Sequence, residues 1–294
     1  MTVKGDNKES ENEIWKIRLH GKCDGKDLKN LTDIAKISNT WVLGLPYDVK
    51  MKGHEYVQLV QVRGNSLATP QRRHRVRQSN QLCTRCGMGA TAGLSHILQQ
   101  CAATQLLRSS RHNQIYKFIT AKLRHRGFHV KLEPKIPNPL RGQPEQLQHF
   151  QPDLIAFKPG NAEVFVLDPC RHLCQLKGEQ VQKTKQDLYQ NDAVHNYVIN
   201  YAKEASRQEF ILIKEKFEAG EEIWDLDGDP TSPYNVVVDA IAVNWRGGIW
   251  ASTYDLLKRK LKISKLSLEI MVTRLLHFSW KIWHNYSADT RTIL

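Results

Sequence analysis

Acidic residues are absent from a long stretch of the chain. No Asp or Glu occurs among the 77 residues of 56–132, whereas 13 Lys and Arg do. The chain of 294 residues has 43 Lys and Arg against 30 Asp and Glu, a net charge of +13 and a pI near 9.5. Outside the block the two signs are therefore balanced, at 30 residues each. A basic block of this length indicates a polyanionic partner, most simply nucleic acid.

Long apolar runs are also missing. The first residues, MTVKGDNKESENEIW, contain no apolar stretch of signal-peptide length. No run in the chain approaches the roughly 20 apolar residues of a membrane span. We therefore expect neither a secreted nor an integral membrane protein. With 40% hydrophobic and 25% charged residues, the chain can build globular cores, which excludes a disordered tail. Because no secretory signal is present, we expect the protein in a reducing compartment. Clustered cysteines there more often hold metal than form disulfides.

Helix and strand patterns alternate through the middle of the chain. Residues before 80 read as mixed helix and strand and end in the basic run TPQRRHRVRQSN, which predicts a loop. A helix is predicted from an N-cap at Ser109 or Ser110 through Leu123, with Gly127 just past its end. Further elements are predicted as strands at 128–133, 153–157, 163–168, 209–213 and 235–245, and as helices at 179–208 and 266–285. This alternation favours a mixed α/β fold.

Half of the six cysteines lie close together beside the basic run. Cys83, Cys86, His96 and Cys101 have the spacing C-x2-C-x9-H-x4-C. Three thiolates and one imidazole suit a tetrahedral zinc ion, and a C-x2-C pair lets one tight turn present two ligands. The alternative is three unrelated buried cysteines. The workable spacing and the small residues of the GMGATAG loop favour a structural zinc site.

A second group, Cys170, His172 and Cys174, has the pattern C-x-H-x-C. Alternate residues of a strand would share one face, but the sequence offers no fourth ligand nearby. We interpret these residues as small side chains at the end of a strand rather than as a metal site.

Two aspartates are predicted to face each other across a hairpin. If 153–157 and 163–168 pair antiparallel about a turn centred between Gly160 and Asn161, paired residue numbers sum to 321, which places Asp153 opposite Asp168. Their side chains would then lie about 5 Å apart. Two facing carboxylates repel and are tolerated best around a divalent cation, for which Mg²⁺ is the natural candidate. The alternative is that each Asp merely begins or ends a strand.

A lysine in the next predicted helix favours the metal interpretation. Val181, Lys185 and Leu188 stand at i, i+4 and i+7 and are predicted to form the stripe that faces the sheet. A lysine on such a face is rare unless it has a partner. Two aspartates, a metal and a lysine together suggest phosphoryl transfer, with the lysine stabilising developing charge. Glu133, at the end of a predicted strand, is a candidate for a further carboxylate.

These motifs, in this order, resemble a known family. QPDLIAF, EVFVLD and then Lys185 are similar to the PD-(D/E)-x-K restriction-type nuclease core, in the variant whose lysine lies on the following helix. Upstream, CTRCGMGATAGLSHILQQC and GFHVKLEPKI resemble the zinc knuckle and first nuclease elements of site-specific non-LTR retrotransposons of the R-two clade. GHEYVQLVQVRGNSLATPQRRHR resembles the linker after their reverse transcriptase, and NWRGGIW with the last helix resembles the C-terminus of their polyprotein.

The resemblance implies a division into a linker at 1–80, a CCHC zinc knuckle at 83–101, a restriction-like endonuclease at 104–245 and a helical extension at 246–294. It implies Mg²⁺ ligation by Asp153 and Asp168, a catalytic role for both and for Lys185, and zinc ligation by the knuckle. Such proteins nick target DNA in the nucleus, and the freed 3′-hydroxyl primes reverse transcription of the element RNA. We expect nucleic-acid contacts from Arg72, Arg73, Arg75, Arg77, Arg108 and Arg111.

A second hypothesis stays open at this point. The paired-Asp palm motif of a polymerase does not occur in the sequence, so the likeness is to the C-terminal part of such a polyprotein. The chain could instead be a truncated or host-adopted protein that grips DNA or RNA without cutting it. A plain α/β domain with a solvated basic face is the weakest alternative, because it leaves both residue clusters as coincidences.

Overall fold

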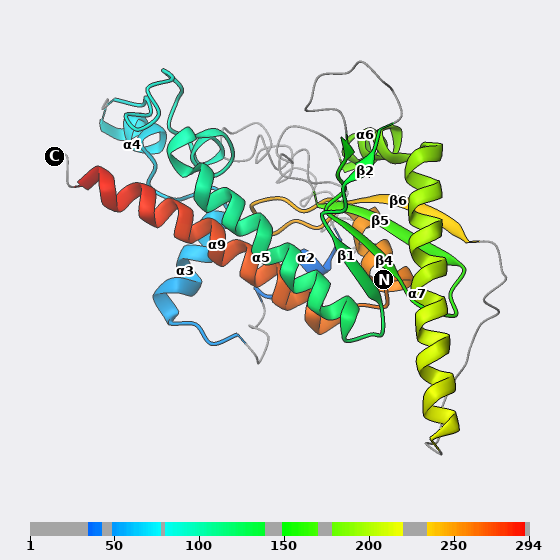
Figure 1. Cartoon of the computed structure of the whole chain (residues 1–294). Coiled ribbons are helices and arrows are strands. Elements are labelled where there is room, and N and C mark those ends of the chain that lie inside the picture. Colours follow the sequence, from blue (N-terminus) through cyan, green and yellow to red (C-terminus); the bar gives the residue numbers. More distant parts are fainter. Residues whose placement is uncertain are drawn as a thin grey trace, which may run out of the picture. The chain divides into compact units, whose positions relative to one another are not determined.

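A computed structural model of the chain describes residues 35–42, 49–77, 80–138, 149–169, 178–219 and 234–291 (Figure 1). The chain divides into two compact units. The sheet unit comprises the described residues within Tyr116–Cys170 and Glu179–Ala242. The helical unit comprises the described residues up to Ile115 and those from Val243 onward. The mixed α/β class predicted from the sequence is confirmed.

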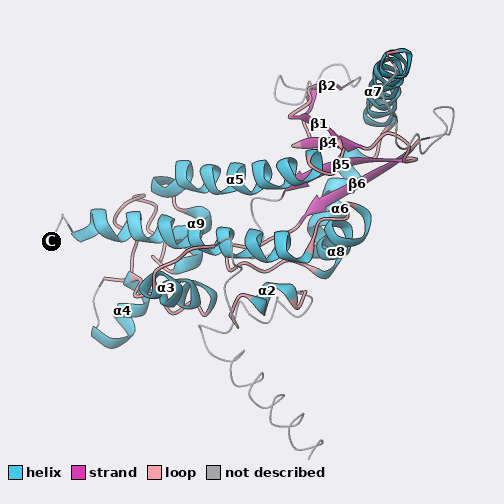
Figure 2. Cartoon of the chain, turned by 90° about the horizontal axis from the view of Figure 1, so that it is seen from below, coloured by secondary structure: helices cyan, strands magenta, loops and turns pink. Residues whose placement is uncertain are grey.

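The sheet unit is built on a four-stranded mixed sheet, whose strands can be followed in order in Figure 2. Its strands stand in the order β1 (His129–Leu132), β4 (Leu154–Phe157), β5 (Glu163–Pro169) and β6 (Asn235–Ile241). β4 pairs antiparallel with β1 and with β5, whereas β6 pairs parallel to β5. A separate small ladder joins β2 (Ile136–Pro137) to β3 (His149–Phe150).

The hairpin of β4 and β5 has the predicted register. Leu154 pairs with Leu167 and Phe157 with Val164, so each pair sums to 321. Gly160 adopts φ +81° in the connecting turn, a left-handed conformation that glycine tolerates best. Every residue of β4 is buried, as expected for a central strand covered on both faces.

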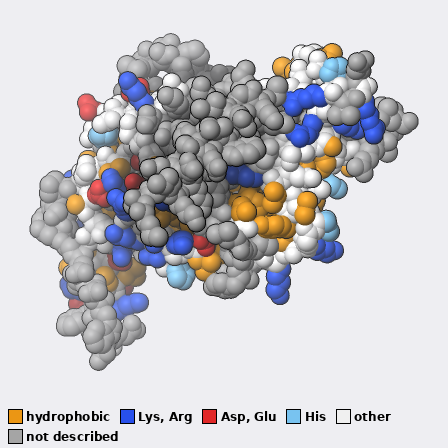
Figure 3. Space-filling model, turned by 180° about the vertical axis from the view of Figure 1, so that it is seen from behind, with side chains coloured by type: hydrophobic (Ala, Val, Ile, Leu, Met, Phe, Trp, Pro, Cys, Tyr) orange, Lys and Arg blue, Asp and Glu red, His pale blue; other side chains and the backbone are white. Residues whose placement is uncertain are grey.

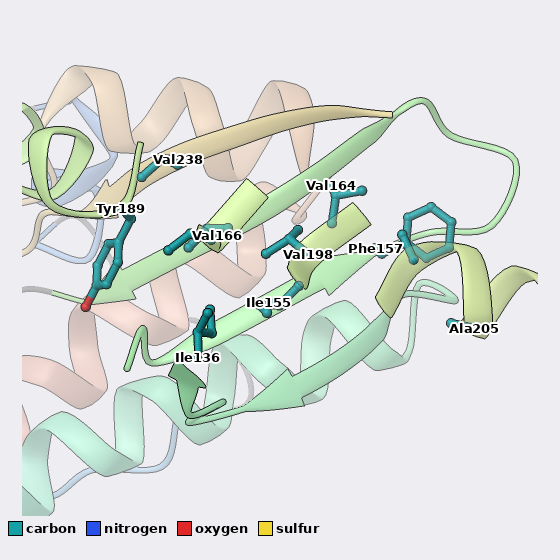
Figure 4. Packing of buried hydrophobic residues seen from close by; sticks show 11 residues of the cluster. Ile136, Ile155, Phe157, Val164, Val166, Tyr189, Val198, Ala205 and Val238 are labelled. Atoms are coloured by element: carbon teal, nitrogen blue, oxygen red, sulfur yellow. The ribbon is translucent and has the colours of Figure 1, made fainter. Parts of the chain in front are cut away.

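Helix α7 (Asp192–Glu218) covers one face of this sheet. Val194, Val198, Ala202 and Ala205 recur at helical spacing and are buried. They form one apolar cluster with strand residues of β4, β5 and β6, shown in Figure 4: Ile155, Phe157, Val164, Val166 and Val238. This packing fixes β4 and β5 against α7 from the turn of the hairpin to the residues near the two aspartates.

The strand predicted at 209–213 is wrong, because these residues continue α7. No Gly or Pro interrupts Asp192–Glu218, and an established helix extends cooperatively at little cost. No strand among the described residues pairs with this run, so its β propensity is overridden. Phe210, Ile211 and Leu212 are instead 52%, 46% and 56% exposed on the helix surface.

The loop predicted for the basic run is also wrong, because Pro70–Arg77 forms helix α4. Thr69 precedes it, and the Thr69 hydroxyl accepts a hydrogen bond from the backbone N–H of Arg72 at 3.3 Å. A threonine cap followed by proline in the first helical position is a recognised start signal. The many charged side chains of the run favoured the loop prediction over this start signal.

Helix α5 (Gln105–Arg124) begins four residues before the predicted N-cap at Ser109. The 3-10 turn η3 (Ala102–Thr104) leads directly into it, so Ser109 and Ser110 lie within the helix. Its predicted end is confirmed, since Gly127 has φ +79° and the N–H of Phe128 bonds back to the carbonyl of Leu123. The strand predicted after it is confirmed as β1.

The helical unit packs around α9 (Lys265–Arg291), which confirms the helix predicted at 266–285. Helices α2 (Ile37–Thr40) and α3 (Gly53–Arg63) and the π-helical turn η2 (His96–Gln100) contact α9. The unit also contains α8 (Ala251–Asp255) and a second π-helical turn, η5 (Leu256–Lys260). The described residues before 78 form helices alone, without the strands predicted there. None of the described helices has the length and apolarity to cross a bilayer.

Candidate functional site

A lysine and an aspartate form an ion pair at the end of β5. Asp168 is 7% exposed, and its Oδ2 lies 2.7 Å from Nζ of Lys185. Lys185 is carried by helix α6 (Gly178–Tyr189), so the predicted orientation of this lysine toward the sheet is confirmed. The predicted apolar stripe is only partly right, because Leu188 is 42% exposed. The helix turns its face with Lys185 and Tyr189 toward Asp168 instead.

Asp153 lies at the same end of the hairpin. It directly precedes β4, and continuing the observed register places it opposite Asp168. Two bonds hold its backbone, because its carbonyl accepts from the N–H of Glu133 at 2.8 Å and from the hydroxyl of Tyr116. The position of Asp153 is thereby tied to the residue that follows β1 and to α5.

The electrostatics of Asp168 reflect competing effects. Burial raises the pKa of its carboxyl and the negative charge of Asp153 raises it further, whereas the hydrogen bonds from Lys185 and Tyr189 lower it. The balance leaves this pKa above its ordinary value. One lysine does not fully compensate two neighbouring carboxylates, so a divalent cation between them would be stabilising.

The donor set fits Mg²⁺. Among the described residues, both hydrogen bonds to the Asp168 carboxylate end on Oδ2, which leaves Oδ1 for a cation. Asp153 supplies a second carboxylate, as expected for a metal that takes hard oxygen ligands and keeps several waters. Asp153 and Asp168 would hold the ion.

Glu133 lies beside Asp153 but its side chain is exposed. Its φ of +44° is unusual for a residue other than glycine. Burial raises the pKa of Tyr116, and the negative charges of Asp153 and Glu133 add to this effect. The charges of Asp153 and Glu133 thus act on the same hydroxyl, and the role of Glu133 as a metal ligand stays a prediction.

The sequence pattern missed Tyr189. Its side chain is 4% exposed and its hydroxyl lies 2.9 Å from Oδ2 of Asp168. A usable signal existed, because residues four apart lie on one face of a helix and Tyr189 follows Lys185 by four positions. The group formed by Cys170, His172 and Cys174 lies outside the described residues.

The four predicted zinc ligands meet in the helical unit. The ligand atoms of Cys83, Cys86, His96 and Cys101 all lie within 4.8 Å of one another. A short bridge between Leu82 and Thr91 closes the loop that carries the first two cysteines. Gly87 and Gly89 have φ values of +64° and +63°, which the tight loop requires. His96 begins η2, and Cys101 directly follows it.

These separations match a tetrahedral ion. Sγ of Cys83 is 3.7 Å from Sγ of Cys101, and Sγ of Cys86 is 3.5 Å from Nε2 of His96. Tetrahedral zinc, with bonds of about 2.3 Å to sulfur and about 2.0 Å to nitrogen, would separate such pairs by about 3.8 and about 3.5 Å. Two of the ligand pairs thus have tetrahedral separations, and the whole group, within 4.8 Å, is compact enough to hold a metal ion.

Neighbouring groups favour the thiolate at Cys83. Burial raises its pKa, but hydrogen bonds from the Tyr286 hydroxyl, from the backbone of Arg85 and Cys86 and from His96 lower it to about 6. Burial raises the pKa of the Cys101 thiol to about 11. The Tyr286 hydroxyl, 3.3 Å from Sγ of Cys83, comes from α9. Such outer-shell bonds commonly orient metal ligands.

The six arginines predicted to contact nucleic acid have different surroundings. Arg73, Arg75 and Arg77 are exposed on α4. Arg72 donates to the carbonyl of Asn65. On the face in Figure 3, Lys and Arg side chains are more prominent than Asp and Glu side chains.

The other two arginines bond to the zinc-ligand segment. Arg108 donates to the carbonyls of Gln99 and Cys101. Arg111 is buried and donates to the carbonyl of Leu98 and the hydroxyl of Ser279. Both guanidinium groups therefore stabilise the chain around η2, and the backbone contacts were not foreseeable from charge.

Comparison with known proteins finds retrotransposon polyproteins. The chain is 26% identical over 286 residues to the "Retrovirus-related Pol polyprotein from type-1 retrotransposable element R2" of Nasonia vitripennis, a match that covers 95% of the chain and 24% of that protein. It is 30% identical over 151 residues to the R2 polyprotein of Popillia japonica, covering 50% of the chain and 19% of that protein. The R2 polyprotein of Bradysia coprophila is 24% identical over 279 residues, a match that covers 95% of the chain and 27% of that protein.

No protein-family model matches the chain. In its long matches the chain spans about a quarter of the length of its curated relatives. The similarity extends over the zinc cluster and over both aspartates, because two matches cover 95% of the chain. The chain is thus homologous to part of the Pol polyproteins of R2 retrotransposons, consistent with the C-terminal part predicted from its motifs.

Proposed function

We propose that the chain is a Mg²⁺-dependent DNA endonuclease, with a restriction-type core in the sheet unit. The observation that carries this proposal is the ion pair of the buried Asp168 with the partly buried Lys185, beside Asp153. A mixed sheet that brings two carboxylates and a lysine to one strand end supports hydrolysis of a phosphodiester. The homology to R2 Pol polyproteins makes DNA the expected substrate.

Each residue has a role that follows from its position. Asp153 and Asp168 would bind Mg²⁺, which supplies an activated water and neutralises charge on the phosphate. The ammonium of Lys185 holds Oδ2 of Asp168 and offers its remaining hydrogens to an oxyanion at this strand end. Because Asp168 is almost fully buried, these interactions are screened little by solvent.

A nick made in this way would leave a 3′-hydroxyl, the group that a reverse transcriptase extends. We therefore assign the nicking step of target-primed reverse transcription as the biological role. A protein that cuts chromosomal DNA acts in the nucleus, and this localisation is part of the proposal. DNA and element RNA are the expected partners.

Replacing Lys185 tests the proposal directly. With Mg²⁺, purified protein is expected to convert supercoiled plasmid to the nicked circle, and EDTA is expected to stop the reaction. Lys185→Met should slow nicking by about 100-fold or more, because it removes a donor at the reaction centre. Lys183→Met, on an exposed position of the same helix, is the matched control and should nick at the wild-type rate. Equal rates for both variants would contradict the role of Lys185.

The second candidate function is nucleic-acid binding without cleavage. The acid-free block of 56–132 favours it, because this block contains α4 with its exposed arginines. Binding through phosphate contacts needs no metal at Asp168 and is compatible with an inactive site.

Changing Arg73, Arg75 and Arg77 together to Ala is expected to weaken binding to duplex DNA. Each lost phosphate contact reduces the slope of log affinity against log salt by about 0.9, so three contacts reduce it by about 2.7. Fluorescence anisotropy at several salt concentrations measures this slope. As a control, Lys214 and Lys216 can be changed to Ala, since both are exposed on α7. An unchanged slope in the triple variant would exclude α4 from the interface.

A further inference from the structure

The hydroxyl of Tyr189 meets both chain segments that carry the carboxylates. It lies 2.9 Å from Oδ2 of Asp168 at the end of β5. It also lies 3.2 Å from the carbonyl of Gln151, two residues before Asp153. Figure 4 shows the Tyr189 ring among the apolar residues of the sheet face, with the hydroxyl at the strand end. The packing of the Tyr189 ring therefore fixes the position of its hydroxyl.

Lys185 and Tyr189 together occupy one carboxylate oxygen. Both donate to Oδ2, at 2.7 and 2.9 Å. A carboxylate oxygen accepts about two hydrogen bonds, so these two donors saturate Oδ2. Only Oδ1 is then left for a cation.

The two donors differ in rigidity. Lys185 has four rotatable side-chain bonds and is partly exposed, so its ammonium can follow Asp168 through several rotamers. Tyr189 is a rigid ring in the core and the last residue of α6. Asn191 begins the next turn, where its side chain caps α7 by accepting the N–H of Val194. The connection between α6 and α7 is thereby held by the buried ring of Tyr189 before it and by the Asn191 cap after it.

We propose that Tyr189 is a positioning residue that orients Asp168 so that Oδ1 faces the metal. This inference rests on the proposed nuclease function and extends it, since Tyr189 touches neither DNA nor the ion in its assigned role. Removal of the hydroxyl leaves Lys185 as the only α6 donor to Oδ2, and the carboxylate gains freedom to rotate. Metal binding then requires Asp168 to be ordered again, which lowers affinity for the ion.

Tyr189→Phe tests this role because it keeps the ring and removes only the hydroxyl. Mn²⁺ serves as the probe for the oxygen site, and its free concentration is followed by electron paramagnetic resonance in the zinc-loaded protein. Binding that persists in Asp168→Asn is subtracted as unrelated to this site. We expect the dissociation constant for Mn²⁺ to rise about tenfold in Tyr189→Phe, the usual scale for an outer-shell partner of a metal ligand. Tyr197→Phe is the control, because Tyr197 stacks on Lys131 in the same unit.

Nicking kinetics give the second readout. The Mg²⁺ concentration for half-maximal nicking should rise about tenfold in Tyr189→Phe, and the rate at saturating Mg²⁺ should fall much less. A variant that melts at a lower temperature but binds Mn²⁺ like the wild type would show Tyr189 to be purely structural and would overturn the inference. Wild-type protein that neither binds Mn²⁺ nor nicks would overturn the nuclease proposal itself. Wild-type nicking with unaltered metal dependence in Tyr189→Phe would overturn only the role of Tyr189.

Discussion

Asp168→Asn is expected to reduce plasmid nicking at least about a thousand-fold, the largest effect of any single substitution in the sheet unit. Asparagine has the shape of aspartate and can still accept hydrogen bonds from Lys185 and Tyr189 through one oxygen. It lacks the negative charge with which Asp168 would hold a divalent cation. The measurement is the rate of nicked-circle formation with Mg²⁺ in excess.

The same variant should not lose stability. Because the pKa of Asp168 is raised in the folded protein, this group stabilises the fold below its unfolded pKa and loses that contribution as the pH rises through the folded pKa. The amide does not titrate and keeps an oxygen that accepts from Lys185 and Tyr189, so Asp168→Asn is expected to melt close to the wild-type temperature. Lost activity with retained stability is the signature of a functional residue.

Asp187→Asn provides the matched control, since Asp187 is exposed on α6. It makes the same change of charge close to Lys185 and should leave nicking unaltered. Rapid nicking by Asp168→Asn would contradict the role of Asp168 as a metal ligand. Slow nicking by both variants would point to a general effect of charge rather than to a metal ligand.

Cys101→Ala is expected to abolish zinc binding and to destabilise the helical unit. Purified wild-type protein should contain one zinc ion per chain by plasma mass spectrometry, and the variant none. A structural zinc site of this kind contributes on the order of 10 kcal/mol to local folding, so loss of one ligand should lower the melting temperature markedly. The loop that carries Cys83 and Cys86 has little apolar core of its own, because its residues 87–89 are exposed.

This destabilisation should extend to α9. Tyr286 bonds to Cys83, and Arg85 donates to the Tyr286 carbonyl at 3.4 Å and lies over its ring. Hydrogen exchange at the C-terminal turns of α9 should therefore increase in Cys101→Ala. Thr84→Ala, exposed within the same turn, should retain the metal and the exchange pattern. A wild-type protein that binds no zinc when supplied with it would contradict the assignment.

Local interactions explain the successes of sequence reasoning. The zinc ligands and their glycine-rich loop lie within 19 residues, so their spacing alone predicted a cluster that the structure brings together. The hairpin register followed from one turn and the period of two in each strand. The end of α5 at Gly127 followed from a positive φ that glycine accepts easily.

Interactions between distant segments explain the failures. The run at 209–213 has the composition of a strand, yet it continues α7, and in the described part of the chain no strand pairs with it. The face of α6 was misjudged by one position, because Tyr189 rather than Leu188 found a polar partner on β5. Arg111, predicted to contact nucleic acid, is buried, and its guanidinium donates to the carbonyl of Leu98 and the hydroxyl of Ser279, bonds that no local pattern indicated.

The sequence by itself therefore determined two residue sets: the four residues whose side chains meet in the Cys3His cluster, and the two aspartates placed opposite each other by a short hairpin. Both sets lie within single short segments, 83–101 and 153–168, where loop closure costs little and residue types nearly decide the geometry. Only the tertiary structure decided which groups complete each set. Tyr189 reaches Asp168 across 21 residues, and Tyr286 reaches Cys83 across 203. Such contacts exist because apolar packing fixes whole helices against distant segments, and no local pattern encodes that arrangement.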